Sequence, residues 1–171
     1  MIEPEFSRLI DLRQVNDQPL VLEPDETEKR RLSGRFGITA IDTMRAQVRL
    51  AMAGEDVTVQ GRLTAAIVQP CAISGEDFPV LIDEPISLRF TREHIAHAPD
   101  EEIEITADDC DVIEYEGTAF DLGEAIAQTL ALAIDPFAEG PDADRARAEH
   151  NLSGDADAGP FAMLRSLTDK P

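Results

Sequence analysis

The sequence predicts an α+β fold in which an antiparallel β-meander forms a curved sheet or a small, partly open barrel. Two observations support this prediction. Apolar and polar side chains alternate along three stretches separated by short turns, which is typical of half-buried antiparallel strands. Two other stretches carry helical signals, one in the N-terminal half and a longer one in the C-terminal half. We expect both helices to pack on the sheet.

The three long strands are expected at residues 44–52, 57–65 and 78–90. Gly54-Glu55-Asp56 separates the first two strands and suits a hairpin turn. Gly61 interrupts the alternation of the second strand, which indicates a bulge or a bend. Shorter strands are expected at residues 6–12, 103–105 and 112–115.

The two expected helices carry different signals. Residues 24–32 place acidic side chains in the first turn and basic side chains in the last, as the helix dipole favours, and Gly34 offers a stop. In the second helix Asp121 is the expected N-cap, with Glu124 three residues later. Apolar side chains then repeat every four residues up to Ile134, just before a proline ends the helix.

The composition predicts one folded domain and a C-terminal tail. We expect a single α+β domain over residues 1–137. Residues 138–159 offer almost no apolar side chains to bury, so residues 138–171 are expected to form an acidic, flexible tail. Residues 160–167 are again apolar and are expected to form a short docking segment within that tail.

Charge is divided unevenly along the chain. Residues 1–92 hold 15 acidic and 11 basic residues, whereas residues 93–171 hold 20 acidic and 4 basic residues. Such a surface repels phosphate backbones and anionic lipid and attracts basic proteins. We therefore predict a partner-binding acidic face that comprises Asp100, Glu101, Glu102, Glu104, Asp108, Asp109, Asp111, Glu114 and Glu116.

The sequence also favours a cytoplasmic protein without a membrane partner. No apolar run approaches the length of a membrane span, and the N-terminus lacks the basic start and apolar centre of a secretory signal. Cys71 and Cys110 are therefore interpreted as reduced thiols.

We tested the sequence for metal and catalytic sites. Cys71, Cys110, His94 and His97 have the residue types of a zinc site, but the cysteines lack the paired C-x2-C spacing, and Ser74 stands where the second one would be. Negative charge around Cys71 disfavours a nucleophilic thiolate, and carboxylates in an acidic run define no catalytic geometry. We expect no catalytic residue, no metal, no cofactor and no enzymatic activity.

One group of cations suggests direct contact with RNA. A basic cluster lies on or just after the first expected helix, and three arginines project from the first two long strands. Pairing within the helix, from Asp25 to Lys29 and from Glu26 to Arg30, is the structural alternative that we favour for the cluster. The RNA-contacting residues under this hypothesis are Lys29, Arg30, Arg31, Arg35, Arg45, Arg49 and Arg62.

Several segments of the chain, taken in order, are similar to segments of a known family. Residues 68–74 run into a cysteine turn and an acidic return strand at 78–85, Phe120-Asp121-Leu122-Gly123-Glu124 opens the second helix, and Ile134-Asp135-Pro136-Phe137 closes it. Residues 160–164 also look like the end of some members. Together these segments resemble the YceD family, the large ribosomal RNA subunit accumulation proteins.

The resemblance implies an accessory protein linked to the synthesis, processing or accumulation of large-subunit rRNA and to large-subunit ribosomal proteins, with no known catalytic residue. Many members carry a second cysteine where this chain has Ser74, and more cysteines near the C-terminus. A zinc role suggested by those members does not carry over to this chain.

Our leading hypothesis is a non-enzymatic ribosome-biogenesis factor that binds a basic large-subunit ribosomal protein, or a pre-ribosomal particle, through its acidic face. Contact with rRNA would then be indirect or weak. The alternative is direct rRNA binding through the arginine-bearing sheet face and the helix at residues 29–31. A filter-binding assay with Arg45→Glu separates these two hypotheses, and the third class, an enzyme, is left without a site.

Overall fold

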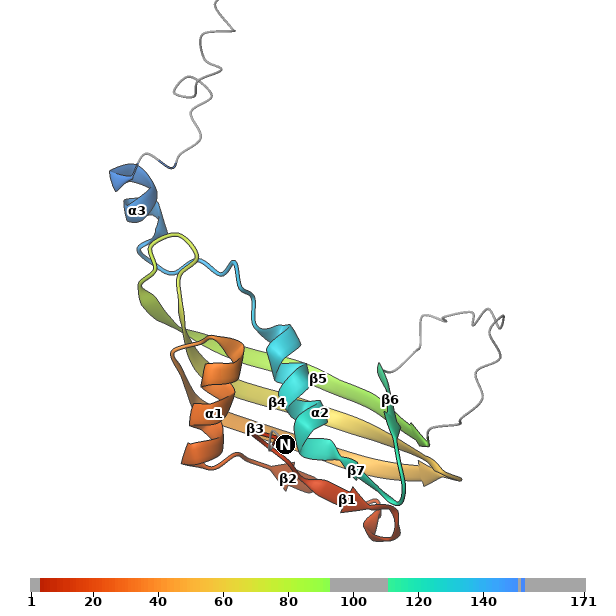
Figure 1. Ribbon diagram of the computed structural model, residues 1–171. Helices are drawn as coiled ribbons and strands as arrows, with labels where there is room; N and C mark the ends of the chain where they lie inside the picture. The colour runs from red at the N-terminus through yellow and green to blue at the C-terminus, as the bar shows by residue number, and fades with distance from the viewer. Residues whose placement is uncertain (1–3, 93–110, 151, 153–171) are drawn as a thin grey trace, which may run out of the picture. The chain divides into compact units, whose positions relative to one another are not determined.

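Figure 1 shows the computed structural model of the chain, which describes residues 4–92, 111–150 and 152. These residues form two units. The first comprises residues up to Gln69 together with Pro79–Asp135, and the second comprises Pro70–Phe78 together with the chain from Pro136. The strand expected at 103–105 and the docking segment expected at 160–167 lie outside the described residues.

The first unit is built on a five-stranded sheet in the order β2-β3-β4-β5-β6. The strands are β2 (Leu20–Leu22), β3 (Ala40–Ala53), β4 (Asp56–Pro70), β5 (Asp77–Arg92) and β6 (Asp111–Tyr115). β3 pairs antiparallel with β2 and with β4, and the connection from β4 to β5 is too short for a parallel crossover. The antiparallel meander of three long strands is thereby confirmed.

The sheet is open, because β2 and β6 are its two margins and do not pair, so no closed barrel forms. One feature of the sheet differs from the expectation. β6, which the alternation at 112–115 predicts, is parallel to β5, with Leu88 opposite Asp111 and Arg92 opposite Tyr115. Periodicity predicts a strand but carries no information about its direction, so this parallel pairing was missed.

The alternation in β3 sorts its side chains onto the two faces of the sheet. Met44, Ala46, Val48 and Leu50 are buried in the hydrophobic core, whereas the polar residues between them are exposed. Helices α1 (Glu26–Phe36) and α2 (Leu122–Ala133) cover the buried face (Figure 1). Their apolar side chains join the same core as those of the sheet.

The irregularity of the meander lies at its start. The register of β3 and β4 shifts between Ile41 and Thr43, whereas Gly61 pairs in continuous register with Val48. A Cβ atom at Gly61 would lie 2.0 Å from the carbonyl oxygen of Gln47. Gly61 therefore marks a close approach of two backbones rather than a bulge.

Helix α1 starts at Glu26 rather than at residue 24, and it also ends later than expected. Asp25 caps it, accepting hydrogen bonds from the N–H groups of Thr27 and Glu28, while the Glu28 side chain accepts from the N–H of Asp25. The helix continues through Gly34 and ends at Gly37, whose φ of 67° is the left-handed conformation that glycine favours. The predicted stop at Gly34 is wrong: Gly34 lies inside the helix with a negative φ, and the left-handed glycine that caps the helix is Gly37.

Helix α2 is capped by Asp121, whose carboxylate accepts from the N–H of Glu124. The preceding residues form β7 (Ala119–Asp121), which pairs with β1 (Leu9–Asp11) in a separate two-stranded sheet. The strand expected at 6–12 is shorter than predicted, because Leu12–Gln14 turn into a 3-10 helix capped by Asp11.

The second unit contains a helix that the sequence analysis did not predict. Helix α3 (Ala143–Glu149) buries Ala143 and Ala146 and lies within the segment expected to be a flexible tail. Arg145 pairs with Glu76 in this unit, at 3.3 Å.

Candidate partner-binding surfaces

The face of the sheet opposite the helices carries a group of exposed polar side chains, which we call the arginine face. The register of β3 and β4 places Arg45 opposite Thr64, Gln47 opposite Arg62, and Arg49 opposite Gln60. All of these side chains are exposed. The three strand arginines therefore lie on one surface, as predicted, because the period of two fixes the face of each residue. The arginine face is Arg45, Gln47, Arg49, Gln60 and Arg62.

Two of these arginines are paired with carboxylates. Arg45 Nη1 lies 2.6 Å from Oε1 of Glu23. Arg62 donates from Nε and Nη2 to the two carboxylate oxygens of Asp83, at 2.5 and 2.9 Å. The hydrogen bond from Arg62 also lowers the pKa of Asp83. Because each pair cancels a positive charge, this face attracts a phosphate backbone less than its three arginines alone would.

Arg49 forms no ion pair within the described residues. Its side chain borders a hollow of about 320 Å³, which is also lined by Val21, Gln47 and Gln60. A guanidinium beside two amides supplies donors and acceptors that suit phosphates and base edges. The sequence analysis missed the two glutamines, although the alternation that places Arg49 on this face places them there as well.

The cations of α1 lie on the helix that covers the other face of the sheet, so they do not join the arginine face. Lys29 Nζ lies 2.5 Å from Oε1 of Glu26 and donates to the carbonyl oxygen of Asp42 at 3.0 Å. Pairing within the helix therefore occurs, although it joins Lys29 to Glu26 rather than to Asp25. Arg30 and Arg31 are exposed and make no ion pair in the part of the chain that the structure describes.

Arg35 has a structural position. Its Nη1 and Nη2 atoms bind the carboxylate of Glu124 on α2, and Nη1 also lies 3.0 Å from Oε2 of Glu5. These contacts hold the pKa of the Glu124 carboxyl below its usual range. Of the seven cations predicted to contact RNA, four are therefore paired within the fold: Lys29, Arg35, Arg45 and Arg62.

The structure covers only one end of the predicted acidic face. Asp111 begins β6, Glu114 is exposed on that strand, and Glu116 is exposed just after it. The remaining acids of the face lie outside the described residues: Asp100, Glu101, Glu102, Glu104, Asp108 and Asp109.

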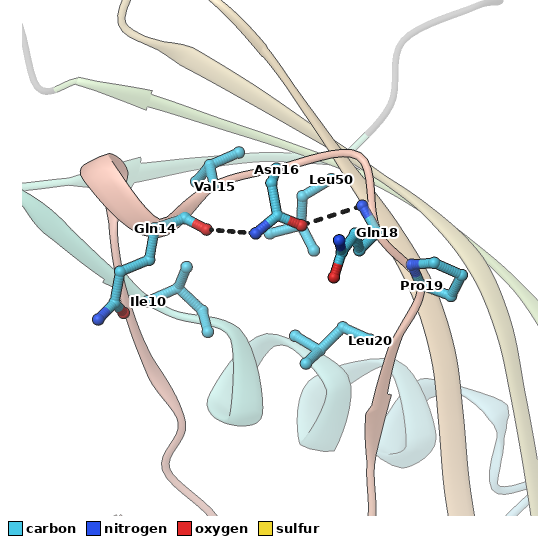
Figure 2. A pocket seen from close by; sticks show the side chains of 8 residues that line it. All are labelled: Ile10, Gln14, Val15, Asn16, Gln18, Pro19, Leu20 and Leu50. Atoms are coloured by element: carbon cyan, nitrogen blue, oxygen red, sulfur yellow. Dashed lines mark hydrogen bonds between the residues drawn. The ribbon is translucent and has the colours of Figure 1, made fainter.

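A pocket that the sequence analysis did not predict opens beside β1 and β2 (Figure 2). Its volume is about 250 Å³, and Ile10, Val15, Leu20 and Leu50 supply its apolar walls. Asn16 stiffens the rim, donating from Nδ2 to the carbonyl of Gln14 at 3.1 Å and accepting from the N–H of Gln18 at 3.0 Å. The eight residues that line the pocket are uncharged, so it suits an apolar side chain rather than acid–base chemistry.

Cys71 lies in the second unit, at the start of a tight turn. The backbone N–H groups of Ile73 and Ser74 donate to its Sγ atom, at 3.4 and 3.3 Å. These bonds stabilise a thiolate, and hydrogen bonds from the Ser74 side chain and backbone are the main cause that lowers the pKa of Cys71 to about 7. Within the described ranges, no cluster of three or more His, Cys, Asp or Glu could hold a metal ion. Three further residues that were considered as zinc ligands lie outside those ranges: Cys110, His94 and His97.

None of the helices in the described ranges has both the length and the apolar composition needed to cross a membrane. No curated protein and no solved structure matches the chain. The profile of the family described as Large ribosomal RNA subunit accumulation protein YceD matches residues 59–167, which is well over half of the sequence. The match begins in β4, includes the Cys71 turn and α2, and continues beyond α3. The chain therefore belongs to the YceD family of large ribosomal RNA subunit accumulation proteins.

Proposed function

We propose that this protein is a non-enzymatic accessory factor in ribosome biogenesis, which supports the synthesis, processing or accumulation of 23S rRNA. In this proposal its acidic face binds a basic large-subunit ribosomal protein, or a pre-ribosomal particle that displays one. The description of its family supports the link to large-subunit rRNA accumulation. The identity of the partner class rests on charge.

The proposal rests on one observation: carboxylates of the same chain neutralise most of the cations that could contact RNA. Of the seven side chains that could bind RNA phosphates, four form ion pairs with carboxylates of the same chain. The segment 100–116, in contrast, contains nine acidic residues and no basic residue. Because a protein of net charge −20 repels RNA at long range, a cationic partner is favoured over a phosphate backbone.

The proposal is tested by offering the immobilised chain two separate samples at low salt, purified large-subunit proteins and protein-free rRNA. We expect selective retention of basic proteins, with bound species identified by mass spectrometry, and little retention of RNA. Retention of RNA with no retention of protein would overturn the proposal.

A second candidate function, direct rRNA binding, is favoured by one specific observation. Arg49 carries no ion pair within the described residues and borders a hollow that Gln47 and Gln60 also line. If this function holds, Arg49→Glu will abolish RNA retention in a filter-binding assay. Arg45→Glu will have a smaller effect, because Arg45 is already paired with Glu23.

A further inference from the structure

The two edge strands of the main sheet differ in how well they are protected from pairing with a further strand. Backbone N–H and C=O groups on the outer side of an edge strand are a template for another strand. At one margin β2 has only three residues, with Pro19 directly before it and Pro24 two residues after it. Short length and nearby prolines both discourage pairing at such an edge.

At the other margin, β6 has five residues and contains no proline. It pairs with β5 on one side, and no other described strand lies on its second side. Its side chain at Val112 is 54% exposed, whereas β2 exposes 43% of Val21. Of these two edge strands of the main sheet, β6 is therefore better suited to accept a further strand.

The fold holds β6 in place before any partner binds. Tyr115 is buried, its ring centroid lies 6.1 Å from that of Phe120, and its hydroxyl donates to the carbonyl oxygen of Glu55 at 2.5 Å. The neighbouring residue of β5, Arg92, pairs with the carboxylate of Glu55 at 2.5 Å. An edge strand that is already ordered binds a peptide with a smaller loss of conformational entropy.

Charge selects the kind of strand that this edge can accept. Glu114 is exposed on β6, Glu116 lies just after the strand, and residues 100–110 before it include six acidic residues and no basic residue. These acidic residues repel a second copy of the same acidic chain, whereas they attract a cationic segment. Arg89 lies opposite Val112 on the β5 side, so the position beside Val112 suits an uncharged residue.

We propose that β6 binds an extended lysine- or arginine-rich segment of the partner as an additional strand, with a cation beside Glu114 and an apolar residue beside Val112. This inference rests on the proposed function, because it names the recognition mode for a basic ribosomal protein. Main-chain hydrogen bonds supply the pairing. Because Val112 and Glu114 lie two residues apart on one face of β6, selectivity comes from an apolar and a cationic side chain that are two residues apart on the added strand.

The test uses the full chain and a synthetic peptide of about eight residues, Lys-Thr-Val-Thr-Lys-Thr-Val-Thr, in which lysine and valine alternate along one face of the strand. Two peptides of the same sequence are the matched controls. One is N-methylated at its odd-numbered residues, and the other at its even-numbered residues. N-methylation keeps the charge but removes the backbone donors on one edge. We expect the unmodified peptide to bind and at least one N-methylated peptide to bind at least tenfold more weakly. We also expect amide hydrogen exchange in β6 to slow in the complex.

Charge selection is tested on the protein side by Glu114→Lys. This variant should weaken binding of the unmodified peptide severalfold, whereas Asp17→Lys, an equal charge change in the loop before β2, should change it little. If all three peptides bind equally and exchange in β6 is unchanged, strand addition is wrong even though charge-driven binding of a basic partner survives. If no peptide binds, this inference also fails, while retention of intact basic ribosomal proteins would leave the proposed function standing.

Discussion

Arg35 and Glu124 form a two-point ion pair between the two helices that cover the sheet, with Nη1 to Oε2 at 2.9 Å and Nη2 to Oε1 at 2.7 Å. Two parallel hydrogen bonds between a guanidinium and a carboxylate give both energy and geometric specificity. Arg35 was predicted to contact RNA, yet the structure uses it to join α1 to α2. A stability measurement can therefore assign its role.

We expect Arg35→Ala to lower the free energy of unfolding by about 1–2 kcal/mol, since a partly buried pair is worth more than an exposed one. Urea denaturation measures this loss. Arg30→Ala is the matched control on the same helix, and it should change stability by less than about 0.5 kcal/mol because Arg30 is exposed and makes no ion pair in the described ranges. Equal effects of the two substitutions would argue against a structural role for Arg35.

The contribution of this pair should depend on pH. In the folded state the hydrogen bond from Arg35 lowers the pKa of the Glu124 carboxyl below its usual value of 4.5. Between the folded and the unfolded pKa of Glu124, the unfolded chain therefore binds a proton that the folded chain does not. The stabilisation that the ion pair gives is complete above the unfolded pKa, and it is lost as pH falls through the folded pKa. The stability difference between the wild type and Arg35→Met should be constant from pH 7 to about 5 and shrink towards pH 3. A difference that stays unchanged at pH 3 would contradict this account.

Two glycines should respond to alanine with opposite signs. At Gly61 an added Cβ would lie 2.0 Å from the Gln47 carbonyl oxygen, a backbone atom that cannot move without disturbing the β3–β4 pairing. At Gly34, inside α1, an added Cβ meets no atom within 4 Å. We expect Gly61→Ala to destabilise the protein by more than about 2 kcal/mol, and Gly34→Ala to stabilise it by about 0.5–1 kcal/mol. Thermal denaturation of both variants checks the signs.

The thiol of Cys71 should ionise near neutral pH. Hydrogen bonds from the side chain and backbone of Ser74 are the largest causes that bring its pKa from 9.0 to about 7. In a Cys110→Ser background, thiolate absorbance should rise with a midpoint near pH 7, and Ser74→Ala should move that midpoint upward. Because the folded pKa is lower than the unfolded one, the protein should gain stability as pH rises from about 7 to about 9. A midpoint near 9 in the wild type would contradict the assigned hydrogen bonds.

Local patterns predicted the parts of the fold that depend on local chemistry. The alternation from Met44 to Met52 identified β3, and the hairpin turn lies where Gly54 adopts a φ of 69°. Asp121 caps α2 as predicted, because a short carboxylate before an amphipathic run can reach the free N–H groups. Asp25 caps α1 in the same way, although it was expected inside the first turn of that helix. Features that depend on distant segments were missed, including the parallel direction of β6 and the pairing of β1 with β7.

The candidate surfaces were predictable only in part for the same reason. The period of the strands placed Arg45, Arg49 and Arg62 on one face correctly. It could not reveal that Asp83, which lies 21 residues after Arg62, would neutralise that arginine. The apolar pocket of Figure 2 likewise joins Ile10 with Leu50, which no local pattern connects.

The central claim is that the acidic face binds a basic large-subunit protein by charge. Its most direct test is the affinity for purified large-subunit proteins, measured as a function of salt, for a variant combining Asp108→Asn, Asp109→Asn and Asp111→Asn. The matched control combines Asp17→Asn, Asp42→Asn and Glu84→Gln, which remove the same number of charges from exposed positions elsewhere.

We predict that the wild type loses affinity steeply between about 50 and 300 mM salt, as screening requires. At the lowest salt, the acidic-face variant should bind at least tenfold more weakly, while the control should bind nearly as well as the wild type. Wild-type affinity in the acidic-face variant, with little dependence on salt, would contradict the account.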